Sequence, residues 1–196
     1  MRRSLRVRIG YALRAGMALL AARWRFMDAQ QITSFVVSTH QVFSTMLSLT
    51  VTAGKPYTCC AVPKFENEVS GIIGMSGDMQ GMVVLSFPTS TAKNVIRAFT
   101  GMDMEPLSPD FADAVGELVN MISGAAKAKF EGKNVSISCP SVVIGKGHKV
   151  AQPSDAVCIT IPFDCPAGQF SVEIAIKSAK AAANPTSQHP SSAKAA

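Results

Sequence analysis

The chain has 196 residues, of which 47% are hydrophobic and 16% are charged. This length and composition predict one domain with a substantial buried core, plus tails. The net charge of +6 is carried by the ends: seven arginines in residues 1–26 and two lysines in residues 179–196, with no acid in either, leave −3 over residues 27–178. The body therefore offers no basic face for nucleic acid.

The cysteines and histidines show no spacing typical of a metal site. We therefore expect free thiols in a reducing cytoplasm, and no metal bound by this chain. No run of 18 apolar residues occurs, so the sequence predicts no transmembrane helix. The cysteines and histidines without metal-site spacing are Cys59, Cys60, Cys139, Cys158, Cys165, His40, His148 and His189.

Residues 1–26 form a basic stretch whose short apolar part is broken by Arg14. A secretory signal needs an unbroken apolar segment and a small-residue cleavage site, and Arg14 and Arg23 count against both, so we do not expect one. An amphipathic segment on a membrane surface is one alternative. We favour another, in which these residues are an extension outside the fold and Met27 is the functional start. The tail, residues 179–196, is rich in Ala, Ser, Pro and Lys, which predicts disorder.

Within residues 27–178, apolar residues at helical spacing predict a helix over residues 28–49. Residues 66–75 and 80–87 read as two strands joined by a turn, and residues 90–99 as a short helix. The glycines of this region, Gly71, Gly74, Gly77 and Gly81, match neither a GxGxxG nor a Walker pattern. We assign them to turns and close packing.

A long helix is predicted over residues 108–131, with Ser108 as N-cap and Pro109 in the first position. Its two faces are nearly opposite at about 100° per residue. The stripe expected to be buried comprises Phe111, Val115, Leu118, Ile122, Ala125 and the stem of Lys129. The outward stripe comprises Asp113, Glu117, Asn120, Gly124 and Lys127.

The outward stripe is unusual for a face that needs only to be soluble. Asn and Gly cost several tenths to about 1 kcal/mol against Ala inside a helix. Glu117 and Asn120, three residues apart, are neighbours on the helix surface. Either this is an ordinary solvated face, or the pair is a functional site.

Three further strands are predicted, over residues 134–144, 156–163 and 168–177. Pro140 interrupts the first of them, which indicates an edge, a bulge or a kink. The order of helices and strands predicts an α+β fold, in which an antiparallel or mixed sheet carries its long helices mainly on one side.

The pattern of Asp113, Glu117 and Asn120, followed by Pro140, resembles the signature of the CheC/CheX/FliY family of chemotaxis phosphatases. The hairpin GIIGMSGDMQGMVVLSFP and the run GELVNMISGAAK are similar to CheX members in particular. The number of residues between Asn120 and Pro140 is slightly smaller than in CheC members. CheC members also carry two such motifs, whereas residues 28–60 contain no second Glu-x-x-Asn pair.

The resemblance implies a cytoplasmic hydrolase that removes the aspartyl phosphate of a CheY-type response regulator. Glu117 and Asn120 would be catalytic, and Asp113, Gly124 and Lys127 would contact the partner. Magnesium would be held by the partner's receiver domain, with no cofactor bound by this chain. A homodimer is also implied.

Two alternatives stay open at this point. Related domains of the flagellar switch act as non-catalytic binding modules, but they lack the Glu/Asn pair that is present here. The other alternative is a structural dimer subunit without activity.

Overall fold

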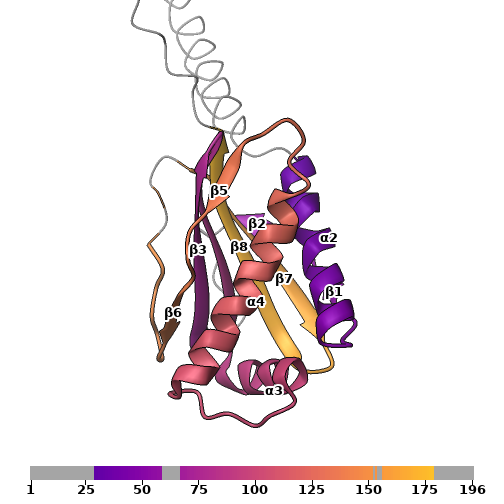
Figure 1. Cartoon of the computed structure of the whole chain (residues 1–196), viewed down its shortest axis with the longest axis vertical. Helices are drawn as coiled ribbons and strands as arrows, with labels where there is room; N and C mark the ends of the chain where they lie inside the picture. Colours follow the sequence, from indigo (N-terminus) through magenta and orange to yellow (C-terminus); the bar gives the residue numbers. More distant parts are fainter. Residues whose placement is uncertain (1–28, 59–66, 152, 154–155, 179–196) are drawn as a thin grey trace, which may run out of the picture.

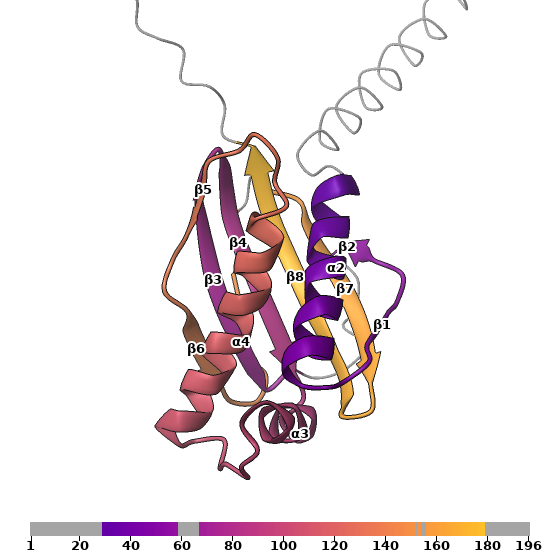
Figure 2. The same ribbon diagram turned by 45° about the vertical axis from the view of Figure 1, so that its right-hand side comes forward.

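The computed structural model describes residues 29–58, 67–151, 153 and 156–178. These residues form three helices and an eight-stranded antiparallel sheet, which confirms the predicted α+β fold. Figures 1 and 2 show α2 (Ala29–Met46) and α4 (Pro109–Lys127) side by side on one face of the sheet, with α3 (Thr89–Thr100) at one end. The predicted extension (1–26) and tail (179–196) lie outside the described residues.

The sheet has the strand order β1-β7-β8-β4-β3-β5, with β2 also paired to β7 and β6 also paired to β3. The long hairpins β3–β4 and β7–β8 lie side by side, because β4 pairs with β8. The strands are β1 (Thr52–Ala53), β2 (Tyr57–Thr58), β3 (Val69–Gly77), β4 (Met79–Phe87), β5 (Val135–Ile137), β6 (Ser141–Ile144), β7 (Cys158–Cys165) and β8 (Gly168–Ser178).

The hydrophobic core lies between this sheet and the helices. Side chains alternate between the two faces of a strand, so every second residue of β3, β4 and β8 points to the helices. Phe170 of β8 stacks on Phe43 of α2, with ring centroids 4.7 Å apart, and on Phe163 of β7 at 5.1 Å. The aromatic rings therefore tie α2 to the sheet.

Most predicted elements are present with shifted ends. The first helix ends at Met46 rather than residue 49, where the N–H groups of Leu47 and Leu49 both donate to the Phe43 carbonyl. The β3–β4 turn is tighter than predicted and contains Gly77 at φ +96°. Gly71 lies against α4, so the assignment to turns and close packing is confirmed for Gly77 and Gly71.

The strand predicted over residues 134–144 is wrong as one continuous strand. Its two parts, β5 and β6, both pair with β3: Ile137 lies opposite Met75, and Ser141 lies opposite Ile72. Three residues of one segment therefore face two residues of β3 between these pairs. Pro140 belongs to this bulge, which was one of the alternatives predicted for it.

The two-residue strands β1 and β2 were not predicted, because so short a segment has no periodicity to read. The expectation of free thiols is confirmed for Cys139 and Cys165. It is wrong for Cys158, which is disulfide-bonded. Sequence spacing carried no signal of this bond, since residues distant along a chain can meet in the fold. In the part of the chain that the structure describes, no helix is long and apolar enough to cross a membrane.

Candidate active site

The candidate site is carried by α4, whose start is fixed by its own residues. Ser108 is the N-cap, and its side chain accepts a hydrogen bond from the Phe111 N–H at 3.2 Å. Pro109 follows in the first turn, and Asp110 complements the positive end of the helix dipole. The predicted N-terminus is thus confirmed.

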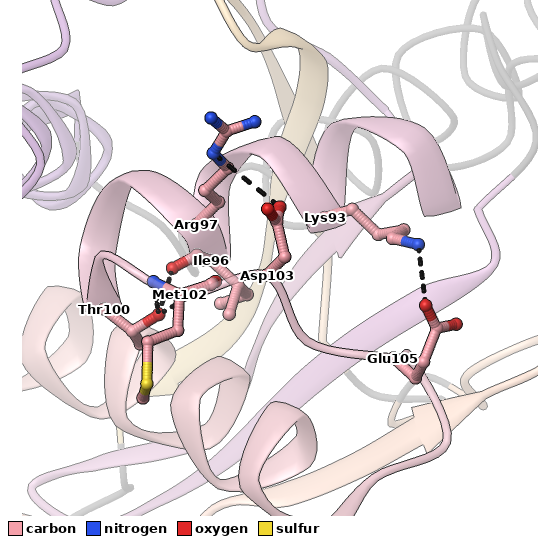
Figure 3. A network of polar contacts seen from close by, with 7 residues as sticks. All are labelled: Lys93, Ile96, Arg97, Thr100, Met102, Asp103 and Glu105. Atoms are coloured by element: carbon pink, nitrogen blue, oxygen red, sulfur yellow. Dashed lines mark hydrogen bonds and ion pairs between the residues drawn. The ribbon is translucent and has the colours of Figure 1, made fainter.

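The connection from α3 to α4 is also held in place (Figure 3). Lys93 and Arg97 on α3 form ion pairs with Glu105 at 3.3 Å and Asp103 at 3.7 Å. Thr100 Oγ1 donates to the Ile96 carbonyl and accepts from the Met102 N–H. These contacts tie the connection to α3 directly before α4 begins.

The buried face of α4 is wider than the predicted stripe. Phe111, Val115, Leu118 and Ile122 are fully buried as predicted, whereas Ala125 is half-buried. Lys129 is also half-buried but lies outside the helix, which ends at Lys127 rather than at the predicted residue 131. Five further residues are buried: Ala114, Gly116, Val119, Ser123 and Ala126. The reason is that α4 packs on α2 and α3 as well as on four strands, β3, β4, β5 and β6.

The predicted outward stripe remains on the surface as a narrow strip. Asp113 and Glu117 are exposed, while Asn120, Gly124 and Lys127 are half-buried. The Asn120 amide Nδ2 donates to Glu117 Oε2 at 3.5 Å, which is a long and weak hydrogen bond. The structure therefore brings the two predicted catalytic side chains together and leaves the amide able to turn to another partner.

The charge of Glu117 is not compensated within the described part of the chain. Each ion pair found there involves other carboxylates. A cation of a docking partner would thus meet a carboxylate that has no competing salt bridge.

Glu117 and Asn120 lie on the accessible surface of α4. A cavity of about 250 Å³ lies elsewhere among the described residues. That cavity is lined by residues from the start of α2, by Met79 of β4 and by residues 129–133, which follow α4, and by neither Glu117 nor Asn120. No group of three or more His, Cys, Asp or Glu side chains suited to a metal ion occurs among the described residues. The site therefore presents one carboxylate and one amide to the surface of a docking partner.

The two glycines of α4 have different surroundings. A Cβ added to Gly124 would meet one atom, Ile137 Cδ1, at 4.0 Å. A Cβ added to Gly116 would lie 3.1 Å from Pro140 Cγ. Gly116 was not singled out from the sequence. The available signal was a glycine in the middle of a helix, directly before Glu117, where glycine is unfavourable.

Comparison with known proteins matches residues 69–164 to the family described as "Chemotaxis phosphatase CheX". The chain is 30% identical over 156 residues to the CheY-P phosphatase CheX of Thermotoga maritima, covering 78% of this chain and 99% of that protein.

Solved structures show the same fold. The chemotaxis protein CheX from Desulfovibrio desulfuricans is 32% identical, with a TM-score of 0.66 over 76% of this chain and 99% of that one. The CheX of a CheX–CheY–BeF3–Mg2+ complex from Borrelia burgdorferi is 23% identical, with a TM-score of 0.63 over 74% of this chain and 97% of that one.

Proposed function

The chain belongs to the CheX family of chemotaxis phosphatases, and we propose from this that it hydrolyses the aspartyl phosphate of a CheY-type response regulator in the cytoplasm. The observation that carries the proposal is the pair of Glu117 and Asn120 on the exposed strip of α4. The strip would lie against the regulator's phosphorylation site, with both side chains inserted.

Asn120 would position the attacking water. An aspartyl phosphate is an activated acyl phosphate, so little covalent work is left to the phosphatase and most of the catalysis is positioning. The amide oxygen of Asn120 can accept a hydrogen bond from the water while its NH2 group donates to a phosphoryl oxygen. The water oxygen then attacks phosphorus, the aspartate leaves as a carboxylate, and inorganic phosphate is released.

Glu117 would orient the regulator rather than attack. A carboxylate in the place of Asn120 would repel the phosphoryl group, but one turn earlier it can pair with a lysine of the receiver domain through a charge-assisted hydrogen bond. The absence of an ion pair on Glu117 among the described residues supports this role.

Asp113, Gly124 and Lys127 would form the rest of the contact surface, and Gly124 has the clearest structural support. Its own chain has room for a methyl group, with a single atom at 4.0 Å, so packing within the described residues does not require glycine there. Glycine costs about 1 kcal/mol against alanine in a helix interior. A close approach of the partner would explain why this position lacks a side chain.

Magnesium would arrive with the regulator. The Borrelia complex contains CheX together with CheY, BeF3 and Mg2+. A metal ion beside the phosphoryl group would neutralise charge as the bond to aspartate breaks. This chain would contribute hydrogen bonds and orientation.

A homodimer remains part of the proposal. The state of the chain in solution can be measured by light scattering coupled to size exclusion, where twice the chain mass of 20.7 kDa is expected. A monomer at the concentrations used for catalysis would refute the dimer without affecting the phosphatase assignment.

The test of the function is the rate at which a phosphorylated CheY-type receiver domain loses phosphate, with and without this chain. Acceleration at catalytic amounts of the chain is the expected result. Binding without acceleration would instead indicate a non-catalytic module, and neither binding nor acceleration would indicate a structural subunit.

A further inference from the structure

The segment between β5 and β6 runs along α4 and is rigidly held. The N–H of Ser138 donates to the Gly74 carbonyl at 2.9 Å, and the Gly74 N–H donates to Ser138 Oγ, also at 2.9 Å. Ser138 Oγ also donates to the Cys139 carbonyl at 2.7 Å. The two bonds to Gly74 fasten the bulge to β3, and the third stiffens it internally.

The bulge turns Pro140 toward α4. Ile137 and Val142 are five residues apart, an odd number that would place them on opposite faces of a continuous strand. The extra residue of the bulge corrects the alternation. Ile137 therefore faces α4 near Gly124, while Pro140 and Val142 both face it near Gly116.

Gly116 allows α4 to touch this segment. It is buried, and an added Cβ would lie 3.1 Å from Pro140 Cγ, 3.4 Å from Pro140 Cβ and 3.7 Å from Val142 Cγ2. The first of these distances is tighter than ordinary contact. With a methyl group there, either α4 or the bulge would have to shift by a few tenths of an ångström.

A second glycine contact sets the height of α4 over the sheet. A Cβ on Gly71 of β3 would lie 2.9 Å from Val119 Cγ1 and 3.3 Å from Val115 Cγ1. The contact at Gly71 therefore sets the distance of α4 from the sheet, and the contact at Pro140 sets its position relative to the β5–β6 bulge.

The side contact at Gly116 lies about one helical turn before Asn120, whose amide is the proposed catalytic group. Helix side chains lean toward the N-terminus, so a residue covers the turn that precedes its own Cα. Asn120 is one turn after Gly116, and its amide reaches back to Glu117. A rotation of α4 about its axis at Gly116 would therefore move this amide directly.

We propose that Gly116 and Pro140 are positioning residues for the phosphatase reaction: their contact fixes the rotation of α4 and thereby the place of the Asn120 amide. The inference rests on the proposed function, because it concerns the same site. Gly116→Ala should displace the amide, since the anchored bulge resists moving.

The test is the dephosphorylation kinetics of Gly116→Ala, Pro140→Ala and the double variant. A misplacement of about 1 Å costs on the order of 100-fold, so a shift of a few tenths should lower kcat by roughly tenfold. KM should change less than kcat, because the outward side chains that contact the regulator keep their chemical identity. In the Pro140→Ala background the clashing Cγ is absent and the remaining Cβ sits at 3.4 Å, so Gly116→Ala should have almost no effect on kcat.

The Asn120→Ala background provides the control that distinguishes a positioning role of Gly116 from a purely structural one. Without the amide, Gly116→Ala should cause no further loss of kcat, because there is nothing left to misplace. Melting temperatures and circular dichroism establish that each variant is folded at the assay temperature. If Gly116→Ala does not fold, the kinetics of Pro140→Ala alone test the inference: a lower kcat is expected, and an unchanged kcat would overturn the inference.

Two results would overturn it directly. One is wild-type kcat in folded Gly116→Ala, and the other is a loss from Gly116→Ala that is equally large with Pro140 present and in the Pro140→Ala background. Failure of the proposed function looks different. In that case the wild-type chain itself would not accelerate phosphate loss, and the inference would fall with it.

Discussion

Glu117 occupies an exposed position on α4, and its charge is left unpaired by the described part of the chain. Its proposed partner is a lysine of the receiver domain. Affinity for the regulator should therefore fall in the order Glu, Gln, Lys at this position. The neutral isostere loses the charge-assisted part of the bond, whereas lysine places like charges opposite each other at a cost of roughly 2–5 kcal/mol.

Titration of the three proteins against a beryllium fluoride complex of the receiver, at low and high salt, measures this order. The differences should shrink at high salt because the charges are screened. Equal affinities would mean that Glu117 does not face a cation.

Gly124 provides a prediction in which stability and binding change in opposite directions. Gly124→Ala should raise the free energy of unfolding by up to about 1 kcal/mol, since the added methyl group has room and alanine favours the helix. The same methyl group should weaken regulator binding by about 1–3 kcal/mol through overpacking at the interface. Thermal melts and the same titration measure both effects, and unchanged affinity would remove Gly124 from the contact surface.

At the residue scale the helical period was sufficient to predict which residues share the outward strip. Asp113, Glu117, Asn120, Gly124 and Lys127 do lie on the accessible side of α4. The period could not predict that Gly116 is covered, because the residue that covers it belongs to a bulge 24 positions later. Contacts of that range are not encoded in local spacing.

Among the secondary-structure elements, α3 begins without a side-chain cap of its own, because its N-cap is Pro88. The carboxylate of Glu68, directly before β3, supplies the missing acceptor and takes a hydrogen bond from the Thr89 N–H at 3.1 Å. Hydrogen bonds from Thr89, and to a lesser extent the charge of Lys146, hold the pKa of Glu68 below its ordinary value.

A lowered pKa in the folded state means that Glu68 stabilises the protein above the ordinary carboxyl pKa and that this contribution is lost as the pH falls below it. The melting temperature of Glu68→Gln should therefore lie below that of the wild type at neutral pH and approach it in acid. Melts recorded between about pH 7 and about pH 3 test this. Glu105→Gln is a suitable control, since its ion pair with Lys93 is exposed and should contribute little at any pH. A difference independent of pH would contradict the capping role.

The elements that could be predicted are those with many apolar residues at regular spacing or with a clear turn. The helix α4 and the hairpin β3–β4 belong to this class. The strands β1 and β2 exist because β7 offers them hydrogen-bonding partners, and two residues carry no pattern of their own. The sequence showed that Pro140 interrupts the predicted strand. That the interruption is a bulge depends on the pairing of both β5 and β6 with β3.

For the whole molecule, composition and element order were enough to predict the fold class, while the order of the strands was not predictable from local signals. Two hairpins can be joined at either edge, and the β4–β8 pairing that joins them here links residues about 90 positions apart. The domain boundaries remain a prediction. Deleting residues 1–26 should leave the melting temperature and the phosphatase rate unchanged, and a loss of either would show that the extension belongs to the functional unit.

Asn120 is central to the proposed chemistry, and one measurement tests its role directly: single-turnover dephosphorylation of a phosphorylated receiver domain by the wild type and by Asn120→Ala, with regulator affinity measured in parallel. Loss of a group that positions the water should lower the rate on the order of 100-fold, about 3 kcal/mol. Affinity and melting temperature should be nearly unchanged, because the amide lies on the accessible strip and makes only a weak bond to Glu117. A variant that dephosphorylates the receiver at the wild-type rate would contradict the proposed positioning of water by Asn120.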